Sequence, residues 1–224
     1  MANTDVLVTG GTAGIGEACA RLFVREGAAV ARLGGSVRFL QADMADIGSV
    51  RDVVRQCGAV DVLDNNAASF PSALTVDQRV DAFDATFATN VRVAYFLAAG
   101  VVPGMVARGR GSIVNVTTMV ATKGVPGAGA YSASKAAVES LTRTWAAEFG
   151  PDGVRVNSVA PGPNRTAGVE AEWGETNEEL GRALPLGRTA TPEEIAQAVL
   201  FLASPRASFV TGSVLHADGG GSAV

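Results

Sequence analysis

The sequence predicts a doubly wound α/β fold, in which a mainly parallel, seven-stranded sheet is covered by helices on both faces. Apolar strand-like runs alternate with helix-like segments along the chain, which is typical of such a sheet. The first run, Val6 to Thr9, breaks into glycines and then enters a helix. With 224 residues, of which 47% are hydrophobic and 18% charged, the chain can bury a large core and is not expected to be disordered. We expect a single domain over residues 1–224.

Two residues mark helix ends in the N-terminal half. Gly27 is a plausible C-cap for the first helix, and Pro103 is expected to end or kink a long helical region. The elements expected in this half are a helix at Gly14 to Glu26, a strand beginning near Ala28, a strand at Val37 to Ala42, a helix at Ile47 to Cys57, a strand at Val60 to Asp64 and a helical region from about Thr75 to Ala107.

The C-terminal half has one clear helix start. Thr191 can act as the N-cap of a helix, Pro192 suits the first helical position and Glu194 completes a capping box. The other elements expected in this half are a strand at Ser112 to Val116, a helix that carries Tyr131 and Lys135 and continues to Phe149, a strand at Val154 to Val159 and a final strand at Val214 to Ala217.

The charge and the cysteines limit the expected partners and location. A net charge of −4 and a pI near 5.1 argue against nucleic acid or an anionic membrane as a main partner. No apolar run is expected to reach transmembrane length, and a first strand that starts by Asp5 leaves no room for a signal peptide. Cys19 and Cys57 lie in predicted helices and are expected to be buried, reduced thiols, which favours a cytoplasmic protein.

A single histidine excludes several reaction classes. His216 is the only histidine, so a multi-histidine metal site is impossible, and the Cys/His spacing typical of zinc is absent. A Ser-His-Asp triad would have to use His216, which lies in a predicted strand near the C-terminus. We expect no metal site, and a packed or surface histidine.

Two motifs carry the predicted chemistry. Gly10, Gly14 and Gly16 lie where the first strand turns into the first helix, where glycines allow close approach of a phosphate and the helix N-terminus offers unpaired N–H groups. Tyr131 and Lys135 are four residues apart on a helix, so they share one face, and an ammonium beside a phenol favours the ionised phenol. The first motif predicts dinucleotide binding and the second predicts proton transfer. Together they indicate nicotinamide-dependent carbonyl or alcohol chemistry.

The order and spacing of these motifs resemble the short-chain dehydrogenase/reductase family over nearly the whole chain. The resemblance implies a Rossmann-type fold, NAD or NADP as the cofactor, and reversible hydride transfer to or from a small alcohol or ketone. The residues on which it rests are Thr9 to Gly16, Asp43, Asn65-Asn66-Ala67, Asn90, Tyr131 with Lys135, Pro161-Gly162 and Asp218-Gly219-Gly220.

The resemblance assigns the proton chemistry to four residues. Tyr131 would be the general acid/base, and Lys135 together with the oxidised nicotinamide ring would lower a phenol pKa that is ordinarily roughly 10. Asn90 would hold a water that bends its helix and completes a proton relay. Thr118, where the family usually has serine, would orient the substrate, and Thr117 is the alternative if the register slips by one.

The resemblance also assigns the cofactor contacts. Asp43 would contact the adenine ring, Thr166 the nicotinamide carboxamide and Lys135 the nicotinamide ribose. The position that decides between NAD and NADP falls on Gly34, which favours neither, although Arg32 weakly favours a 2′-phosphate. The full set of expected cofactor-binding residues is Gly10, Thr12, Gly14, Ile15, Gly16, Asp43, Met44, Asn66, Ala67, Tyr131, Lys135, Pro161, Gly162 and Thr166.

Further expectations concern the lid and the assembly. A mobile substrate lid is expected over about residues 167–184, where Val169, Trp173 and Leu180 either form apolar walls or belong to a packed surface flap. The helices around Asp84 to Val102 and Ala133 to Phe149 carry apolar residues beyond one sheet-facing stripe, and in the family the matching helices pair between subunits. We therefore expect a homotetramer with dihedral symmetry. The apolar residues concerned include Val93, Tyr95, Phe96, Val138, Leu141 and Trp145.

Two departures keep another interpretation open. Asp64 stands where an apolar strand residue is expected, and a buried carboxylate is costly unless it is paired. Only about five residues separate the strand that begins near Ala28 from the strand at Val37 to Ala42, which is too few for a parallel crossover. We therefore predict that residues are missing between about Val30 and Ala31, with a smaller shortfall near Cys57-Gly58. These features favour a catalytically weak, cofactor-binding sensor or scaffold, whereas a dehydratase or epimerase would need acid/base groups that the sequence does not reveal.

Overall fold

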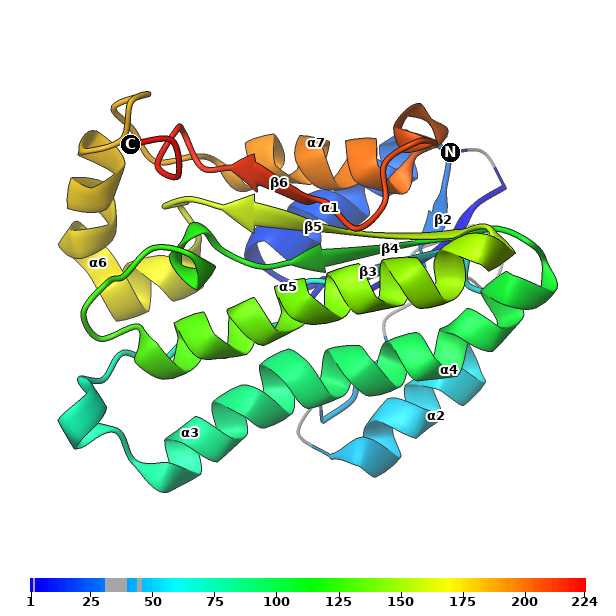
Figure 1. Ribbon diagram of the computed structural model, residues 1–224, viewed down its shortest axis with the longest axis horizontal. Helices are drawn as coiled ribbons and strands as arrows, with labels where there is room; N and C mark the ends of the chain where they lie inside the picture. Colours follow the sequence, from blue (N-terminus) through cyan, green and yellow to red (C-terminus); the bar gives the residue numbers. More distant parts are fainter. Residues whose placement is uncertain (2, 31–39, 44–45) are drawn as a thin grey trace.

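In the computed structural model, which describes residues 1, 3–30, 40–43 and 46–224, the strands form one six-stranded sheet (Figure 1). The strand order is β2-β1-β3-β4-β5-β6, and every neighbouring pair is parallel. The chain builds from β1 to β2 at one edge and then from β3 to β6 at the other, so the predicted doubly wound α/β class is confirmed. The strands are β1 (Asp5–Val8), β2 (Ala29–Val30), β3 (Val62–Asn65), β4 (Gly111–Val116), β5 (Val154–Pro161) and β6 (Val214–Ala217).

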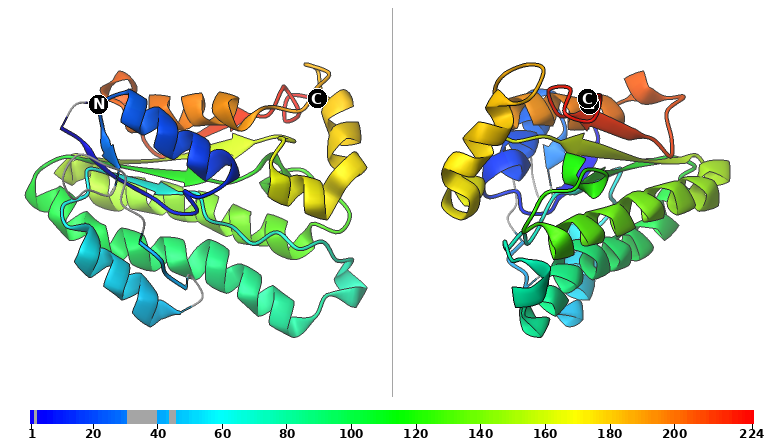
Figure 2. Two further views of the ribbon diagram at one scale, coloured as in Figure 1. Left: turned by 180° about the vertical axis from the view of Figure 1, so that it is seen from behind. Right: turned by 60° about the vertical axis from the view of Figure 1, so that its left-hand side comes forward.

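Helices cover both faces of this sheet (Figure 2). On one face, α1 and α7 enclose a core that includes Phe23 and Leu202, and on the other, α2, α4 and α5 enclose a core that includes Leu63 and Leu97. The predicted capping box at Thr191 is present at the start of α7. The helices are α1 (Gly14–Arg25), α2 (Ile47–Cys57), α3 (Val80–Phe87), α4 (Val93–Ala107), α5 (Gly129–Phe149), α6 (Ala167–Arg182) and α7 (Pro192–Ala203).

The sheet has one strand fewer than predicted in the part of the chain that the structure describes. Residues 40–42, the end of the strand expected at Val37 to Ala42, have no strand structure, and residues 37–39 lie outside the described residues. A parallel neighbour for β2 would need a crossover of a dozen or more residues, which this stretch does not supply. Arg32, Gly34, Met44 and the break predicted between Val30 and Ala31 also lie outside the described residues.

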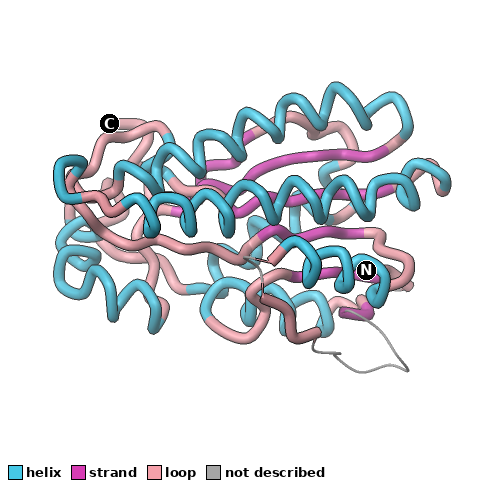
Figure 3. The backbone as a smooth tube through the Cα atoms, turned by 90° about the horizontal axis from the view of Figure 1, so that it is seen from below, coloured by secondary structure: helices cyan, strands magenta, loops and turns pink. Residues whose placement is uncertain are grey.

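The α3 and α4 helices and a π-helical turn between them form one continuous helix, Val80–Ala107, which runs beside α5 beneath the sheet (Figure 3). Pro103 lies inside α4 and does not end it; the irregular point is the π turn at Ala88–Arg92. This 28-residue helix, with a mean hydropathy of 1.4, is long and apolar enough to cross a membrane, contrary to the expectation from the sequence. It also supplies Leu97 and Met105 to the core, which is a common reason for such an apolar helix.

The long helix exposes several aromatic side chains. Phe83, Tyr95 and Phe96 are 41%, 46% and 40% exposed, and the Tyr95 ring lies 5.9 Å from the Trp145 ring of α5. The rings of Tyr95 and Phe96 contact each other at a centroid distance of 5.4 Å, and Phe83 stacks on Phe87. The other apolar residues expected beyond the sheet-facing stripe belong to the interior: Val93, Val138 and Trp145 are buried, and Leu141 is half-buried.

Candidate active site

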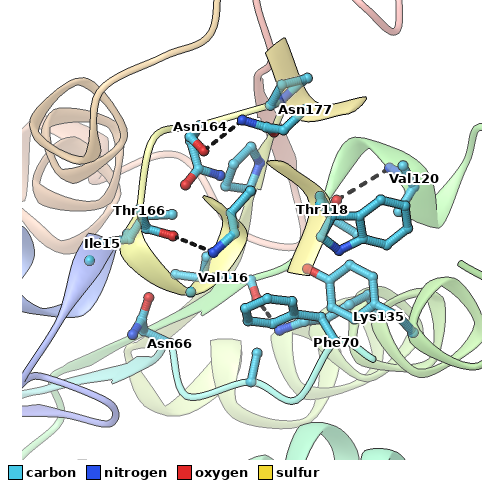
Figure 4. A pocket seen from close by; sticks show the side chains of 18 of the residues that line it. Ile15, Asn66, Phe70, Val116, Thr118, Val120, Lys135, Asn164, Thr166 and Asn177 are labelled. Carbon is cyan, nitrogen blue, oxygen red and sulfur yellow. Dashed lines mark hydrogen bonds between the residues drawn. The ribbon is translucent and has the colours of Figure 1, made fainter. Parts of the chain in front are cut away.

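A cavity of about 390 Å³ opens where the strands end, between the β1–α1 turn, the start of α5 and α6 (Figure 4). The carboxyl edge of an open parallel sheet, at the point where the strand order reverses, is the usual ligand site of doubly wound folds. The predicted site residues that line the cavity are Gly10, Thr12, Gly14, Ile15, Asn66, Ala67, Thr118, Tyr131, Lys135, Pro161, Gly162 and Thr166.

The β1–α1 turn requires glycine at three positions. Gly10 and Gly14 have φ angles of 65° and 54°, which residues with a side chain rarely adopt. A Cβ on Gly16 would lie 2.3 Å from the Gly10 carbonyl oxygen and 2.4 Å from Nδ2 of Asn66. These constraints produce a compact turn at the N-terminus of α1, where a phosphate can approach the backbone closely.

Thr9 and Asn66 hold this turn against the end of β3. The Thr9 Oγ1 accepts hydrogen bonds from the backbone N–H groups of Asn66 and Ala67, both at 2.9 Å. In return, Asn66 Nδ2 donates to the Thr9 carbonyl at 3.0 Å. The two strand ends are therefore locked together directly beneath the cavity.

Tyr131 lies in the first turn of α5, and its ring meets Phe70 edge to face at a centroid distance of 6.1 Å. Burial raises the pKa of Tyr131 to about 12, and a hydrogen bond with the Thr118 hydroxyl offsets part of that rise. The sequence had suggested a lowered pKa. The lowering expected from Lys135 together with the oxidised nicotinamide ring stays a prediction, because among the protein groups alone desolvation of the phenolate outweighs the polar neighbours of the phenol.

Lys135, one helical turn further along α5, is nearly fully buried and donates from Nζ to the Val116 carbonyl at 2.7 Å. Its Nζ lies 5.9 Å from the centroid of the Tyr131 ring. Burial lowers the pKa of Lys135 to about 8. Since the end of β4 occupies one of its donors, the ammonium can offer its other donors to hydroxyl groups of a ligand in the cavity.

Asn90 lies in the π turn and connects three segments. Its Oδ1 accepts from the Ser69 N–H at 2.7 Å, and its Nδ2 donates to the Ser69 carbonyl at 2.8 Å and to Ser134 Oγ at 2.9 Å. A second cavity of about 10 Å³ touches both Asn90 and Lys135, which is about the smallest space that holds one water. Asn65 also lines it, and its buried Oδ1 has no hydrogen-bond partner among the described residues. A water in this small cavity would meet the Asn65 Oδ1 as an acceptor and the Lys135 ammonium as a donor.

The two threonines at the end of β4 point to different neighbours. Thr117 is buried and donates from Oγ1 to Glu139 Oε1 at 3.0 Å. Thr118 lies within hydrogen-bonding reach of Tyr131, and its Oγ1 accepts from the Val120 N–H at 3.4 Å. The geometry therefore favours Thr118 over Thr117 as the hydroxyl that meets a substrate.

The end of the cavity near α6 fits a nicotinamide. Asn164 donates from Nδ2 to the Gly162 carbonyl at 3.2 Å, while its buried Oδ1 has no hydrogen-bond partner in the part of the chain that is described. Thr166 caps α6 by accepting from the Val169 N–H at 3.2 Å. An unpaired buried acceptor suits the carboxamide N–H, the spare donors of Lys135 suit ribose hydroxyls, and the glycine turn suits a pyrophosphate. The residues present fit NAD or NADP.

The α6 helix closes one side of the cavity, within the predicted lid. It breaks at Gly174, where φ is 44° and ψ is −124°. Asn177 donates from Nδ2 to the Asn164 carbonyl at 3.2 Å, and Glu172 Oε1 accepts from the Ser72 N–H at 2.8 Å, so the lid is anchored on both sides. Val169, Trp173 and Leu180 line the cavity, which favours the wall interpretation over a surface flap.

Some predicted residues do not join this site. Asp43 is exposed and is not among the cavity-lining residues, and Met44 lies outside the described residues. His216 is exposed and lies 3.1 Å from Ser222 Oγ, as expected of a surface histidine. Cys19 is buried as predicted, but Cys57 is only half-buried.

The lining residues that the sequence did not single out include Phe70, Asn164 and Asn177. Asn164 lies between Gly162 and Thr166, so the motif that predicted its neighbours also contains it. Phe70 and Asn177 have no comparable local signal, because they reach the cavity only when the segment after β3 and the lid fold over it.

Known proteins with similar sequences and structures define the class of this chain. Residues 31–222 match the family described as Enoyl-(Acyl carrier protein) reductase. The 3-oxoacyl-[acyl-carrier-protein] reductase FabG of Thermotoga maritima is 38% identical, with 96% of each chain covered. A solved short chain dehydrogenase/reductase family protein is 56% identical, with a TM-score of 0.94 and coverage of 100% of this chain and 99% of that one. A Beutenbergia cavernae protein solved with NADP at low occupancy is 35% identical, with a TM-score of 0.94 and coverage of 100% and 98%.

The chain belongs to the short-chain dehydrogenase/reductase family. It is an NAD(P)-dependent oxidoreductase that acts on CH–OH or C=O groups. The FabG alignment runs over 235 positions although it uses 96% of a 224-residue chain, so that relative has residues without a counterpart here. A shortened chain gives this result, but the alignment length does not locate the shortening. The break after Val30 stays a prediction.

Proposed function

We propose that Tyr131 is the proton donor and acceptor in a reversible alcohol/ketone reaction on a small molecule, with NAD or NADP bound in the main cavity. The observation that supports this most strongly is that Tyr131, Thr118 and Lys135 line the same cavity as the glycine turn. The cofactor, when bound, supplies or accepts the hydride. The residues of the chain bind and orient the cofactor and the substrate, and Tyr131 transfers the proton.

In the direction of reduction, the phenol of Tyr131 gives its proton to the carbonyl oxygen of the substrate. Its pKa of about 12 keeps it protonated near neutrality, and Thr118 offers a second hydroxyl to the same oxygen. In the direction of oxidation, the Lys135 ammonium favours the phenolate that accepts the alcohol proton. The small cavity between Lys135 and Asn90 offers a route by which the proton is exchanged.

Cofactor binding and turnover test this proposal separately. The protein is titrated with NADH and NADPH while nicotinamide fluorescence is followed, and a panel of neutral ketones is then added. We expect fluorescence enhancement, followed by ketone-dependent loss of cofactor absorbance. Binding without turnover across the panel would instead support a sensor or scaffold, and failure to bind either cofactor would contradict both interpretations.

We also propose a cytoplasmic homotetramer with dihedral symmetry. The exposed side chains of Phe83, Tyr95 and Phe96 on the long helix support the oligomer, since aromatic side chains are enriched at protein interfaces. Light scattering at micromolar concentration should give the mass of four chains. A monomer would contradict the proposal.

A further inference from the structure

The substrate end of the main cavity has apolar walls. Val169, Trp173 and Leu180 lie on the inner face of α6, and Phe70 and Val125 close the cavity from two other loops. The side chains of Tyr131 and Thr118 line the same cavity, at the start of α5 and just after β4. These surroundings suit a hydrocarbon body with one oxygen directed at the two hydroxyls.

Cations are scarce around this space. Among the described residues that line the cavity, Lys135 is the only cationic side chain, and its Nζ is held by the Val116 carbonyl. Arg165 and Arg182, beside and within α6, are paired with Glu178 and Glu175 of the same helix. Apart from Lys135, the described lining therefore has no cation to bind a phosphate or carboxylate.

The lid itself is strongly acidic. The α6 helix carries five glutamates and one arginine. One of these carboxylates joins α6 to the segment that follows β3, because Glu172 Oε1 accepts from the Ser72 N–H. Glu170 and Glu179 are exposed and have no ion-pair partner within 4.0 Å among the described residues. An anionic group that approaches this lid meets like charge, which lowers the association rate.

We infer that this enzyme takes a free, uncharged, apolar ketone or secondary alcohol, and not an acyl group delivered on an anionic handle. Such a handle is a phosphate-bearing pantetheine arm or an acidic carrier protein. The inference rests on the proposed function and departs from the carrier-bound substrate in the name of the 38% identical relative. The apolar walls select the body of the substrate, and the acidic lid disfavours the handle.

One acyl group on different handles separates these effects. A 3-oxoacyl group is offered as its ethyl ester, its N-acetylcysteamine thioester, its coenzyme A thioester and its acyl carrier protein thioester, beside a bulky alicyclic ketone. The holoenzyme is assayed for kcat/KM at low and high ionic strength. We expect the neutral thioester to exceed both anionic thioesters by about tenfold or more at low salt, and the difference to shrink as salt screens the lid.

A pair of charge-neutralising variants tests the role of the lid. Glu170→Gln with Glu179→Gln should raise kcat/KM for the coenzyme A thioester about threefold or more at low salt and leave the neutral ester unchanged. The matched control is Glu26→Gln with Glu148→Gln, which removes two exposed carboxylates from the far ends of α1 and α5. The control should change neither rate.

Three outcomes would contradict the inference or its basis. A higher kcat/KM for the carrier-bound thioester than for the neutral thioester overturns the inference and leaves the proposed function intact. Equal rates that do not respond to salt or to the lid variants also overturn it. A protein that binds cofactor but turns over none of the five probes counts against the proposed function itself.

Discussion

The two faces of the sheet treat buried polar groups differently at adjacent residues of β3. Asn65 faces α5, and its Nδ2 donates to Asn115 Oδ1 at 2.9 Å. The row continues across the sheet, because Asn115 Nδ2 donates to Thr142 Oγ1 at 2.8 Å and that oxygen lies 2.7 Å from Ser158 Oγ. On this face, buried polar groups form a connected network between the strands and α5.

Asp64, one position earlier, points to the α1 face, because successive strand residues alternate. It is fully buried and pairs in register with Val8 and Val114. Apart from a weak interaction with the Cys19 thiol, neither carboxyl oxygen has a hydrogen-bond partner among the described residues. Burial raises the pKa of Asp64 to about 7 and also raises the pKa of the Cys19 thiol.

The polar groups on the α5 face are hydrogen-bonded to one another, whereas Asp64 is isolated. Lys135, Asn90 and Thr117 all lie on the α5 side, and each has a hydrogen-bond partner there. The face covered by α1 and α7 also buries Ser112 and Asn157, which donate to the Leu202 and Val210 carbonyls, whereas the carboxyl oxygens of Asp64 have no comparable partner among the described residues. We infer that the α5 face can support proton transfer, whereas Asp64 reduces stability near neutral pH.

The first test asks whether the chemistry depends on the phenol of Tyr131. Tyr131→Phe keeps the ring and its contact with Phe70 but removes the proton donor, so turnover should fall by about 10³-fold or more. Cofactor affinity, measured by nicotinamide fluorescence, should change little. The control is Tyr95→Phe, at the only other tyrosine, which lies on the exposed face of α4. Near-normal turnover by Tyr131→Phe would show that another group is the acid.

The second test removes the buried ammonium of the same face. Lys135→Met keeps the stem and deletes the charge and the bond to Val116, so turnover should fall by about 10²-fold and the cofactor Kd should rise. Because the pKa of Lys135 is about 8, the wild-type Kd should also rise as the pH increases through about 8 and the ammonium is lost. The variant should lack that step.

Lys123→Met is the matched control, since Lys123 is the other lysine of the chain and its Nζ donates to the Gly221 carbonyl. It should keep both the wild-type Kd and its rise above pH 8. If both lysine variants lost affinity equally, the effect would come from net charge and not from the cavity.

Only part of this site could be predicted from the sequence. The glycine motif and the pair Tyr131 and Lys135 could be recognised in the sequence, because short motifs on a regular strand and helix have fixed geometry, and Gly10, Gly14, Tyr131 and Lys135 line one cavity. The burial that raises the pKa of Tyr131 could not be predicted, because desolvation depends on which distant segments cover a side chain.

The remaining differences have the same origin. Phe70 and Asn177 reach the cavity through tertiary folding, which no local pattern records. Residues 40–42 are the end of the predicted third strand and are apolar enough for a strand. The segment that precedes them is too short to cross over to the edge of the sheet. Asp64 was correctly marked as out of place, because a carboxylate in an apolar strand is unusual whatever its partners are.

The third test concerns the isolated carboxyl group. The folded-state pKa of Asp64 is about 7, above the ordinary value of 3.8, so the folded state binds more protons than the unfolded state between these values. The free energy of unfolding should therefore fall as the pH rises through this window and stay low above it. Asp64→Val should remove this slope and raise the free energy of unfolding at pH 8 by about 3 kcal/mol, measured by urea denaturation.

Asp84→Asn is the control for this change, because Asp84 is an exposed carboxylate on α3. It should leave the pH dependence unchanged. A wild-type stability that did not fall between pH 4 and 7 would show that Asp64 has polar partners in solution that compensate its charge.

The smallest effect is expected where the polar interior is satisfied. Thr142 Oγ1 accepts from Asn115 Nδ2 and donates to the Val138 carbonyl at 2.9 Å. Thr142→Val keeps the shape of the side chain but leaves the Asn115 amide buried without its acceptor, which should lower the free energy of unfolding by about 1–3 kcal/mol. Thr144→Val, two residues along the same helix, is exposed and should change it by less than about 0.5 kcal/mol.

The pH dependence of the Thr142→Val effect completes the comparison between the two faces. No member of the row formed by Asn115, Thr142 and Ser158 titrates, so the loss should be the same at pH 4.5 and pH 8, whereas the gain from Asp64→Val should appear mainly at the higher pH. The two sites lie on opposite faces without a shared partner in the described structure, so their effects should add in the double variant. A loss at Thr142 that grew with pH, or effects that failed to add, would mean that Asp64 is coupled through the sheet to the network on the α5 face.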